Sequence, residues 1–266
     1  MWVGQQLADG LDFWGFLGSL ILGGIILGIY TGLLGYVGAK TGLSLDLLSQ
    51  RAFGEKGSYL PSAMTSFTQI GWFSVGSFVS GGTATPNFAR FAKNGKAGAI
   101  TTVVAFFIGN SLMFFFGAVS SIFVGGNDIF EVMVRLNLFY LAVLVLGLNI
   151  WTTNDNALYT AGLGLANIFH QRKKPMVLLS GIIGTVASVW LYYNFCGWLN
   201  ILNCTLPPVG MILVLAYFMN KEDFETDQPK LKTIDWFAVA GVILGAIVAN
   251  LLHWGIASIN GMVVAA

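Results

Sequence analysis

Charged residues are scarce in this 266-residue chain, since they make up 9% of it where a soluble domain carries about 25%. Apolar residues make up 56% and aromatic residues 14%. So few charges cannot cover a water-facing surface, which excludes a soluble enzyme or a soluble binding module. The net charge of +1 provides no field that would attract a polyanion, so no nucleic-acid partner is expected.

Cysteines and catalytic motifs are also few. The two cysteines, Cys196 and Cys204, have no CxxC or histidine spacing, so neither a disulfide framework nor a metal site is predicted from them. The sequence has no HExxH motif, no Gly-Lys phosphate loop and no nucleophile paired with a base. We therefore expect no organic cofactor, and a membrane-embedded enzyme is disfavoured because Asp155 is the only carboxylate deep in an apolar stretch.

Seven apolar stretches are long enough to cross a bilayer, which takes about 20 helical residues. They fall near residues 12–38, 58–79, 98–124, 137–169, 176–196, 199–219 and 234–252. They lack the period-2 alternation of a membrane β-barrel, so the sequence predicts an all-α integral membrane protein embedded in the lipid bilayer. No basic leader with a cleavage site is visible at the start, so the spans themselves are expected to direct insertion.

Two local features modify these predicted helices. Gly24, Gly28 and Gly32 repeat every four residues, which either lets a neighbouring helix approach closely or reflects the general abundance of glycine in membrane helices. Pro207 and Pro208 predict a break in the helix over 199–219 or a bend in it.

The basic loops do not alternate across the membrane along the whole chain. Loops 39–57, 85–97, 170–175 and 220–233 are rich in Lys and Arg and are predicted to lie in the cytoplasm, whereas 125–136 is predicted to lie outside. Only one apolar stretch separates 39–57 from 85–97, and one helix cannot begin and end on the same side. We interpret 58–79 as two half-spans with a segment missing between Gly76 and Ser77; a re-entrant hairpin is the rival explanation.

Polar residues within apolar stretches are the candidates for function, because they are costly in a membrane. Gln69 and Trp72 lie three residues apart and share a helix face, where an amide beside a flat ring suits a planar heterocycle. The alternative is that they serve packing between helices. Residues 77–83 place Phe78 and several hydroxyl groups around two glycines, which predicts either a broken helix exposed to substrate or an ordinary helix end.

A third polar cluster lies inside the stretch 137–169. Asn149, Thr152, Thr153 and Asn156 follow the i, i+3, i+4, i+7 pattern and so form one oxygen-rich stripe on a helix face. Threonine hydroxyls and a backbone carbonyl one turn earlier are ligands that a dehydrated Na⁺ accepts; hydrogen bonding between helices is the alternative. Asp155 is a candidate ion or proton site, but we favour a role in anchoring a neighbouring helix.

Four segments carry a family resemblance: residues 35–42, 68–73, 81–91 and 149–159. They resemble the nucleobase–cation symporter-1 family, and the resemblance covers essentially the whole chain. It implies one transporter domain over 1–266 with the inverted-repeat fold of sodium-coupled amino-acid transporters, in which helices one and six of twelve are broken. Against that pattern the chain is expected to lack half of helix one before Met1 and roughly two and a half spans of about 20 residues between Gly76 and Ser77.

The resemblance also implies a substrate site. Gln69 would be the hydrogen-bonding amide of helix three and Trp72 its stacking ring. Phe78 would be the opposing aromatic ring, and Ser77 and Ser80 would offer hydroxyl or backbone contacts to the base.

The same resemblance implies a sodium site formed by the Asn149 carbonyl and the Thr152 and Thr153 hydroxyls. The implied function is sodium-coupled uptake of cytosine across the bacterial inner membrane by alternating access, with a nucleobase and sodium as partners. A carrier of uracil, a hydantoin or a purine is one alternative. A multi-span receptor or sensor is another, although the loops predicted on the same side count against it.

Overall fold

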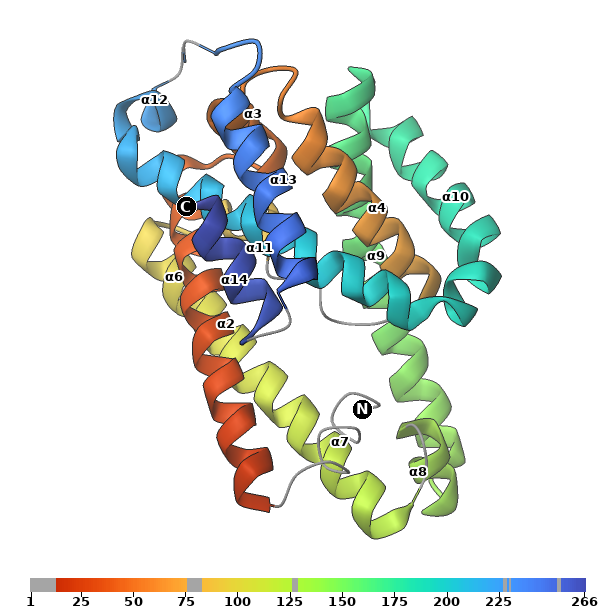
Figure 1. Ribbon diagram of the computed structural model, residues 1–266. Coiled ribbons are helices and arrows are strands. Elements are labelled where there is room, and N and C mark those ends of the chain that lie inside the picture. Colours follow the sequence, from red (N-terminus) through yellow and green to blue (C-terminus); the bar gives the residue numbers. More distant parts are fainter. Residues whose placement is uncertain (1–12, 76–82, 126–128, 227–228, 230, 253–254) are drawn as a thin grey trace. The chain divides into compact units, whose positions relative to one another are not determined.

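The computed structural model describes residues 13–75, 83–125, 129–226, 229, 231–252 and 255–266. Within these ranges the regular secondary structure is entirely helical, which confirms the predicted all-α class. The helices (Figure 1) are α2 (Phe13–Thr41), α3 (Leu45–Phe53), α4 (Tyr59–Val75), α5 (Pro86–Ala89), α6 (Gly95–Val104), the π-helical turn η2 (Ala105–Gly109), α7 (Asn110–Val124), α8 (Ile129–Arg135), α9 (Phe139–Phe169), α10 (Lys173–Tyr193), α11 (Phe195–Met219), α12 (Lys221–Glu225), α13 (Trp236–Leu251) and α14 (Ala257–Ala265).

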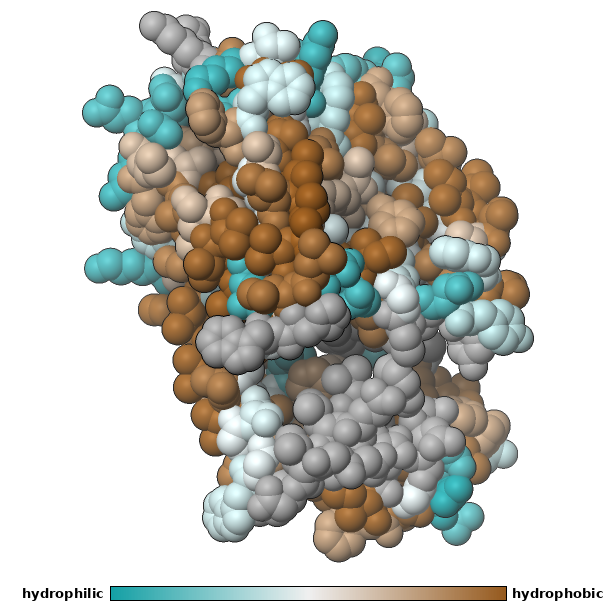
Figure 2. Space-filling model, viewed as in Figure 1, coloured by the Kyte–Doolittle hydropathy of each residue, from teal (hydrophilic) through white to brown (hydrophobic). Residues whose placement is uncertain are grey.

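Each predicted apolar stretch contains a long helix. Four helical segments among the described residues are long and apolar enough to cross a membrane: Trp14–Thr41, Gly95–Val124, Lys173–Leu191 and Gly197–Met219. Their outward side chains are largely apolar. On α10, for example, Val186 is 80% exposed and Val189 67% exposed, and Figure 2 shows hydrophobic residues over much of the visible face. The chain is a multi-pass membrane protein.

The predicted break at Pro207 and Pro208 is wrong, because α11 continues through both prolines to Met219. A hairpin of small residues lies beside the ring of Pro208. A Cβ added to Gly245 of α13 or to Gly261 of α14 would lie 3.2 Å from the ring of Pro208. A membrane helix tolerates such prolines where neighbouring elements compensate for the lost hydrogen bond.

The chain forms two compact units. The first comprises residues 1–32 and 100–152, and the second comprises residues 33–99 and 153–266. In the first unit the glycine repeat of α2 packs against a side chain, since a Cβ at Gly24 would lie 3.0 Å from the ring of Phe107. The glycine at position 24 therefore allows the ring of Phe107 to pack closely against α2. Close approach of a neighbouring helix was one of the two explanations offered by the sequence.

In the second unit the basic loops lie together at one end. Pro86 approaches Gly38, where an added Cβ would lie 2.7 Å from the proline Cα, and the Asn87 side chain accepts a hydrogen bond of 2.8 Å from the Leu45 amide. The Glu55 amide donates to the Lys232 carbonyl at 2.7 Å. Loops 39–57, 85–97 and 220–233 therefore share one end of this unit, as the distribution of their charges predicts. The predicted junction at Gly76 and Ser77 lies outside the described residues.

Candidate functional site

The predicted substrate residues that the structure describes lie on α4. Gln69 is buried, with 7% of its surface exposed, and α4 packs against α10 and α11. Trp72 lies in the last turns of the same helix, but its side chain is outside the described part of the structure, as are the residues Ser77, Phe78 and Ser80. The structure thus places the amide of Gln69 in the interior of the second unit and leaves the predicted aromatic pair untested.

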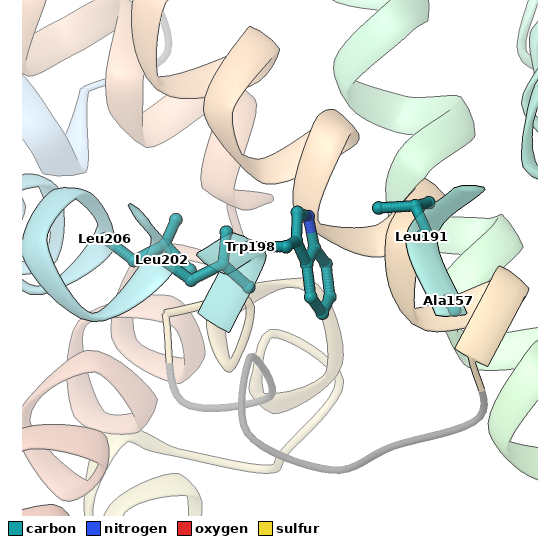
Figure 3. Close-up of a cluster of buried hydrophobic side chains, with 5 residues drawn as sticks. All are labelled: Ala157, Leu191, Trp198, Leu202 and Leu206. Carbon is teal, nitrogen blue, oxygen red and sulfur yellow. The ribbon is translucent and has the colours of Figure 1, made fainter. Parts of the chain in front are cut away.

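A tryptophan of α11 covers the backbone of α4 between Gln69 and Trp72. Trp198 is 3% exposed and belongs to a cluster with Ala157, Leu191, Leu202 and Leu206, in which its indole lies between residues of α9, α10 and α11 (Figure 3). A Cβ added to Gly71 would lie 2.5 Å from Cε2 of this ring and still closer to Cζ2. Glycine at position 71 is therefore required for the close approach of α11 to α4.

Helices α4 and α9 run antiparallel where their polar side chains meet. Asn167 donates to the Ser62 hydroxyl at 2.9 Å, and the Ser66 hydroxyl donates to the carbonyl of Ala161 at 3.1 Å. From the first contact to the second, the residue on α4 lies nearer the end of its helix and the residue on α9 lies nearer the start of its helix. From this register we expect Gly71, which Trp198 covers, to lie near the level of Ala157, another member of the Trp198 cluster, and the next turn of α9 toward its start to lie near the last turns of α4.

That next turn contains Asn154, whose Oδ1 atom is buried and has no hydrogen-bond partner among the described residues. Leaving a buried acceptor unsatisfied costs about 1–3 kcal/mol, so such a group requires an explanation. A ligand that donates an N–H is one. Asn154 lies off the oxygen-rich stripe, so its spacing gives no signal; the burial of its side-chain oxygen makes it a candidate.

The predicted sodium ligands lie on the continuous helix α9. The Thr152 hydroxyl donates to the carbonyls of Leu148 and Asn149, at 3.1 Å each, so two of the three predicted oxygen ligands lie side by side. Thr152 and Asn149 are exposed within the structure, whereas Thr153 is half-buried. The boundary between the two compact units falls between Thr152 and Thr153.

Two further candidates of this helix are Asp155 and Asn156. Asp155 is exposed and has no hydrogen bond or ion pair with the described residues, so the favoured anchoring role has no partner there. Asn156, the last member of the stripe, is also exposed. No group of three or more His, Cys, Asp and Glu side chains that could hold a metal ion occurs in the described ranges.

The sequence is similar to known transport proteins over nearly its full length. It matches a family described as permease for cytosine/purines, uracil, thiamine, allantoin through two stretches, residues 1–85 and 74–265. It is 36% identical to the cytosine permease of Escherichia coli strain K12 over 355 aligned positions, which cover 98% of this chain and 84% of the relative. The cytosine permeases of Escherichia coli O6:H1 and O157:H7 give the same values. The alignment is longer than the 266-residue chain, so these relatives contain residues without a counterpart in it.

Proposed function

The chain belongs to the family of permeases for cytosine/purines, uracil, thiamine and allantoin, and from this membership we propose that it carries cytosine into the cell together with sodium. Members of this family are permeases and not enzymes, in agreement with the absence of catalytic motifs from the sequence. The observation that carries the proposal is the 36% identity to a cytosine permease across 98% of the chain.

The substrate site of the proposal is formed by α4 and the residues that follow it. The Gln69 amide both donates and accepts hydrogen bonds, which suits the mixed edge of a cytosine ring. Trp72 and Phe78 would stack on its two faces, with Ser77 and Ser80 at its edge. The buried position of Gln69 supports this assignment, since a polar ligand group in a dry site is recognised by the few polar groups that line it.

Asn154 adds a second amide to this site. Its Oδ1, which has no hydrogen-bond partner among the described residues, could accept from the exocyclic amine of cytosine, which uracil lacks. A site built around a hydrogen bond rejects an analogue that cannot form it, because the buried group is then left unpaired. Asn154 is therefore proposed as a residue that favours cytosine over uracil.

The coupling ion of the proposal is sodium, held by the Asn149 carbonyl and the Thr152 and Thr153 hydroxyls. The 3.1 Å separation between the Thr152 hydroxyl and the Asn149 carbonyl supports the proposal, because adjacent hard oxygens are what such a cation requires. If sodium and cytosine bind between the two halves of an inverted-repeat fold in the bacterial inner membrane, the protein can open to one side of the membrane at a time, which is alternating access. Sodium would favour the state that captures cytosine.

The binding of radiolabelled cytosine to the purified chain tests this function. We expect the Kd for cytosine to rise when Na⁺ is replaced by choline, and unlabelled cytosine to compete better than uracil, a hydantoin or a purine. An equal Kd in choline would refute the coupling. Better competition by another base would leave a transporter of that base, the alternative that the family description also covers.

We also propose that relatives contain a segment that is absent between Gly76 and Ser77 of this sequence. Two findings support it: the two family matches meet and overlap over residues 74–85, and the alignment to the relatives is longer than the chain. Inserting the unmatched residues of the Escherichia coli K12 relative after Gly76 should strengthen cytosine binding. No gain over an insertion of a scrambled segment of equal length would contradict this proposal.

A further inference from the structure

A buried carboxyl group lies outside the helices long enough to span a membrane, at the end of the second unit where the basic loops meet. Asp46 is in the first turn of α3, after the N-cap residue Ser44, and is 5% exposed. The Ser62 hydroxyl of α4 donates to its Oδ1 at 2.6 Å. A Cβ added to Gly164 of α9 would lie 3.5 Å from the same oxygen. The carboxyl is thus enclosed by three helices.

The hydrogen bonds around Asp46 connect those three helices. Asn167 of α9 donates to the hydroxyls of Ser62 and Ser58, at 2.9 and 3.0 Å, and accepts from the Gln50 side chain of α3 at 2.6 Å. The Ser58 hydroxyl in turn donates to the Glu55 carbonyl at 2.7 Å. Because Ser62 gives its one proton to Asp46, Asp46 is the acceptor at which this network ends.

The environment of Asp46 opposes its charge more than it supports it. Burial raises the pKa of the Asp46 carboxyl to about 6, although the Ser62 hydroxyl, its own backbone amide and the Arg90 guanidinium act in the opposite direction. Arg90 directs its guanidinium to the Tyr159 hydroxyl and lies over the Phe91 ring. One positive charge that is shared in this way does not compensate for the loss of water around the carboxylate.

Several titratable groups on the helices packed around α3 have partners of their own. Tyr59 of α4 bonds to His170 at 2.6 Å, and Tyr217 of α11 donates to Glu225 of α12 at 2.8 Å. Asp235, the N-cap of α13, pairs with Lys232 at 2.8 Å. In the same region Lys40 pairs with Glu225 at 3.5 Å, Lys173 lies over the ring of Tyr159, and Asp223 of α12 accepts from Arg51 through its backbone carbonyl.

The sign of the effect follows from linkage. A carboxyl that binds its proton more tightly when buried than in water stabilises the buried arrangement while it is protonated. As the pH rises through the pKa of the buried form, the ionised group favours any movement that restores its contact with water. Release of α3, a helix of 9 residues joined to α4 by a short loop, is the smallest such movement.

We infer that Asp46 is a proton-binding site, and that its bound proton holds α3 against α4 and α9 while loss of the proton loosens α3. This inference does not depend on which substrate the chain carries. It assigns to the end of the second unit a response to the pH of the compartment that it faces, separate from the proposed substrate and sodium residues.

Hydrogen exchange of the full chain in lipid nanodiscs, followed by mass spectrometry, tests the inference. Exchange times are scaled for the intrinsic dependence of amide exchange on pH. Between about pH 5 and about pH 8, opening of residues 45–53 should increase about tenfold, as a shift of the pKa from 3.8 to about 6 requires. In Asp46→Asn, whose amide oxygen can still accept from Ser62, the scaled exchange should not depend on pH. Asp223→Asn, on a neighbouring exposed carboxylate, and His170→Gln should retain the tenfold increase.

Ser62→Ala provides an independent test if Asp46→Asn fails to fold. It removes a donor that favours the ionised form, so the pH at which exchange of 45–53 stops rising should move upward from about 6. An increase that is absent from the unsubstituted chain, that persists in Asp46→Asn, or that does not move upward in Ser62→Ala would overturn the inference. Neither result depends on cytosine or sodium, so it is distinct from a failure of the proposed transport.

Discussion

Replacement of Gly71 by alanine should weaken both the fold and cytosine binding, because α11 lies directly against this position. An added Cβ would lie 2.5 Å from Cε2 of Trp198, whereas ordinary contacts between carbon atoms begin near 3.4 Å. The indole would have to move by about 1 Å within a cluster in which it is 3% exposed. Overpacking of this kind costs about 1–3 kcal/mol, so we expect the free energy of unfolding to fall by about 2 kcal/mol.

The substitution should also affect binding, since Gly71 lies between Gln69 and Trp72. A displacement of α4 that is used to relieve the contact would shift the Gln69 amide. If half of the expected strain is expressed there, cytosine binding weakens by about fivefold, because 1.4 kcal/mol corresponds to a factor of about ten. Thermal unfolding in detergent and the Kd for cytosine measure the two effects.

The control is Gly18→Ala on α2, where an added Cβ meets nothing within 4 Å. It should leave both quantities unchanged or slightly improve stability. Trp198→Leu in the Gly71→Ala background should recover part of the lost stability, so that the two changes are not additive. If Gly71→Ala is as stable as Gly18→Ala, the close packing of α11 on α4 would be refuted.

Three further outcomes follow from the same contacts. Thr152→Val should reduce the sodium dependence of cytosine binding at least tenfold. The control Thr205→Val, which also removes a hydroxyl bonded to a carbonyl of its own helix, should not change it. Equal effects of the two substitutions in the binding assay would show that Thr152 is not part of the ion site. Asn154→Leu should reduce the preference for cytosine over uracil in competition assays by about 1–3 kcal/mol, and an unchanged preference would exclude it from the substrate site. Gly245→Val should lower the unfolding temperature, because a Cβ there would lie 2.6 Å from the Gly261 carbonyl, and an unchanged temperature would disprove that contact.

The helices could be predicted from the sequence because a bilayer demands long apolar segments, and few soluble proteins have them. The stretch 137–169 is an example. It forms the single helix α9 (Phe139–Phe169), although the polar residues at its centre lower the local hydropathy. The continuation of α11 through its two prolines could not be predicted, since the elements beside it, such as Gly245 and Gly261 against Pro208, are distant in the chain. That information lies in tertiary packing and not in local preference.

The candidate site was predictable only in part. The stripe that contains Asn149 and Thr152 follows from helical spacing, and the position of the loops around Leu45 and Asn87 at the same end follows from charge. The proposed roles of Asn154 and Asp46 could not be predicted from the sequence, because each role depends on burial by residues that are distant in the chain. Ser62 and Asn167, which complete the Asp46 network, are separated by 105 positions, and no local pattern connects them.

The most direct test of the central claim is a sodium titration of the purified chain with and without saturating cytosine. Thermodynamic linkage requires cytosine to tighten sodium binding by the same factor by which sodium tightens cytosine binding. We predict equal factors, both lost in Thr152→Val and retained in Thr205→Val. A sodium affinity that is identical with and without cytosine would contradict sodium-coupled transport by this chain.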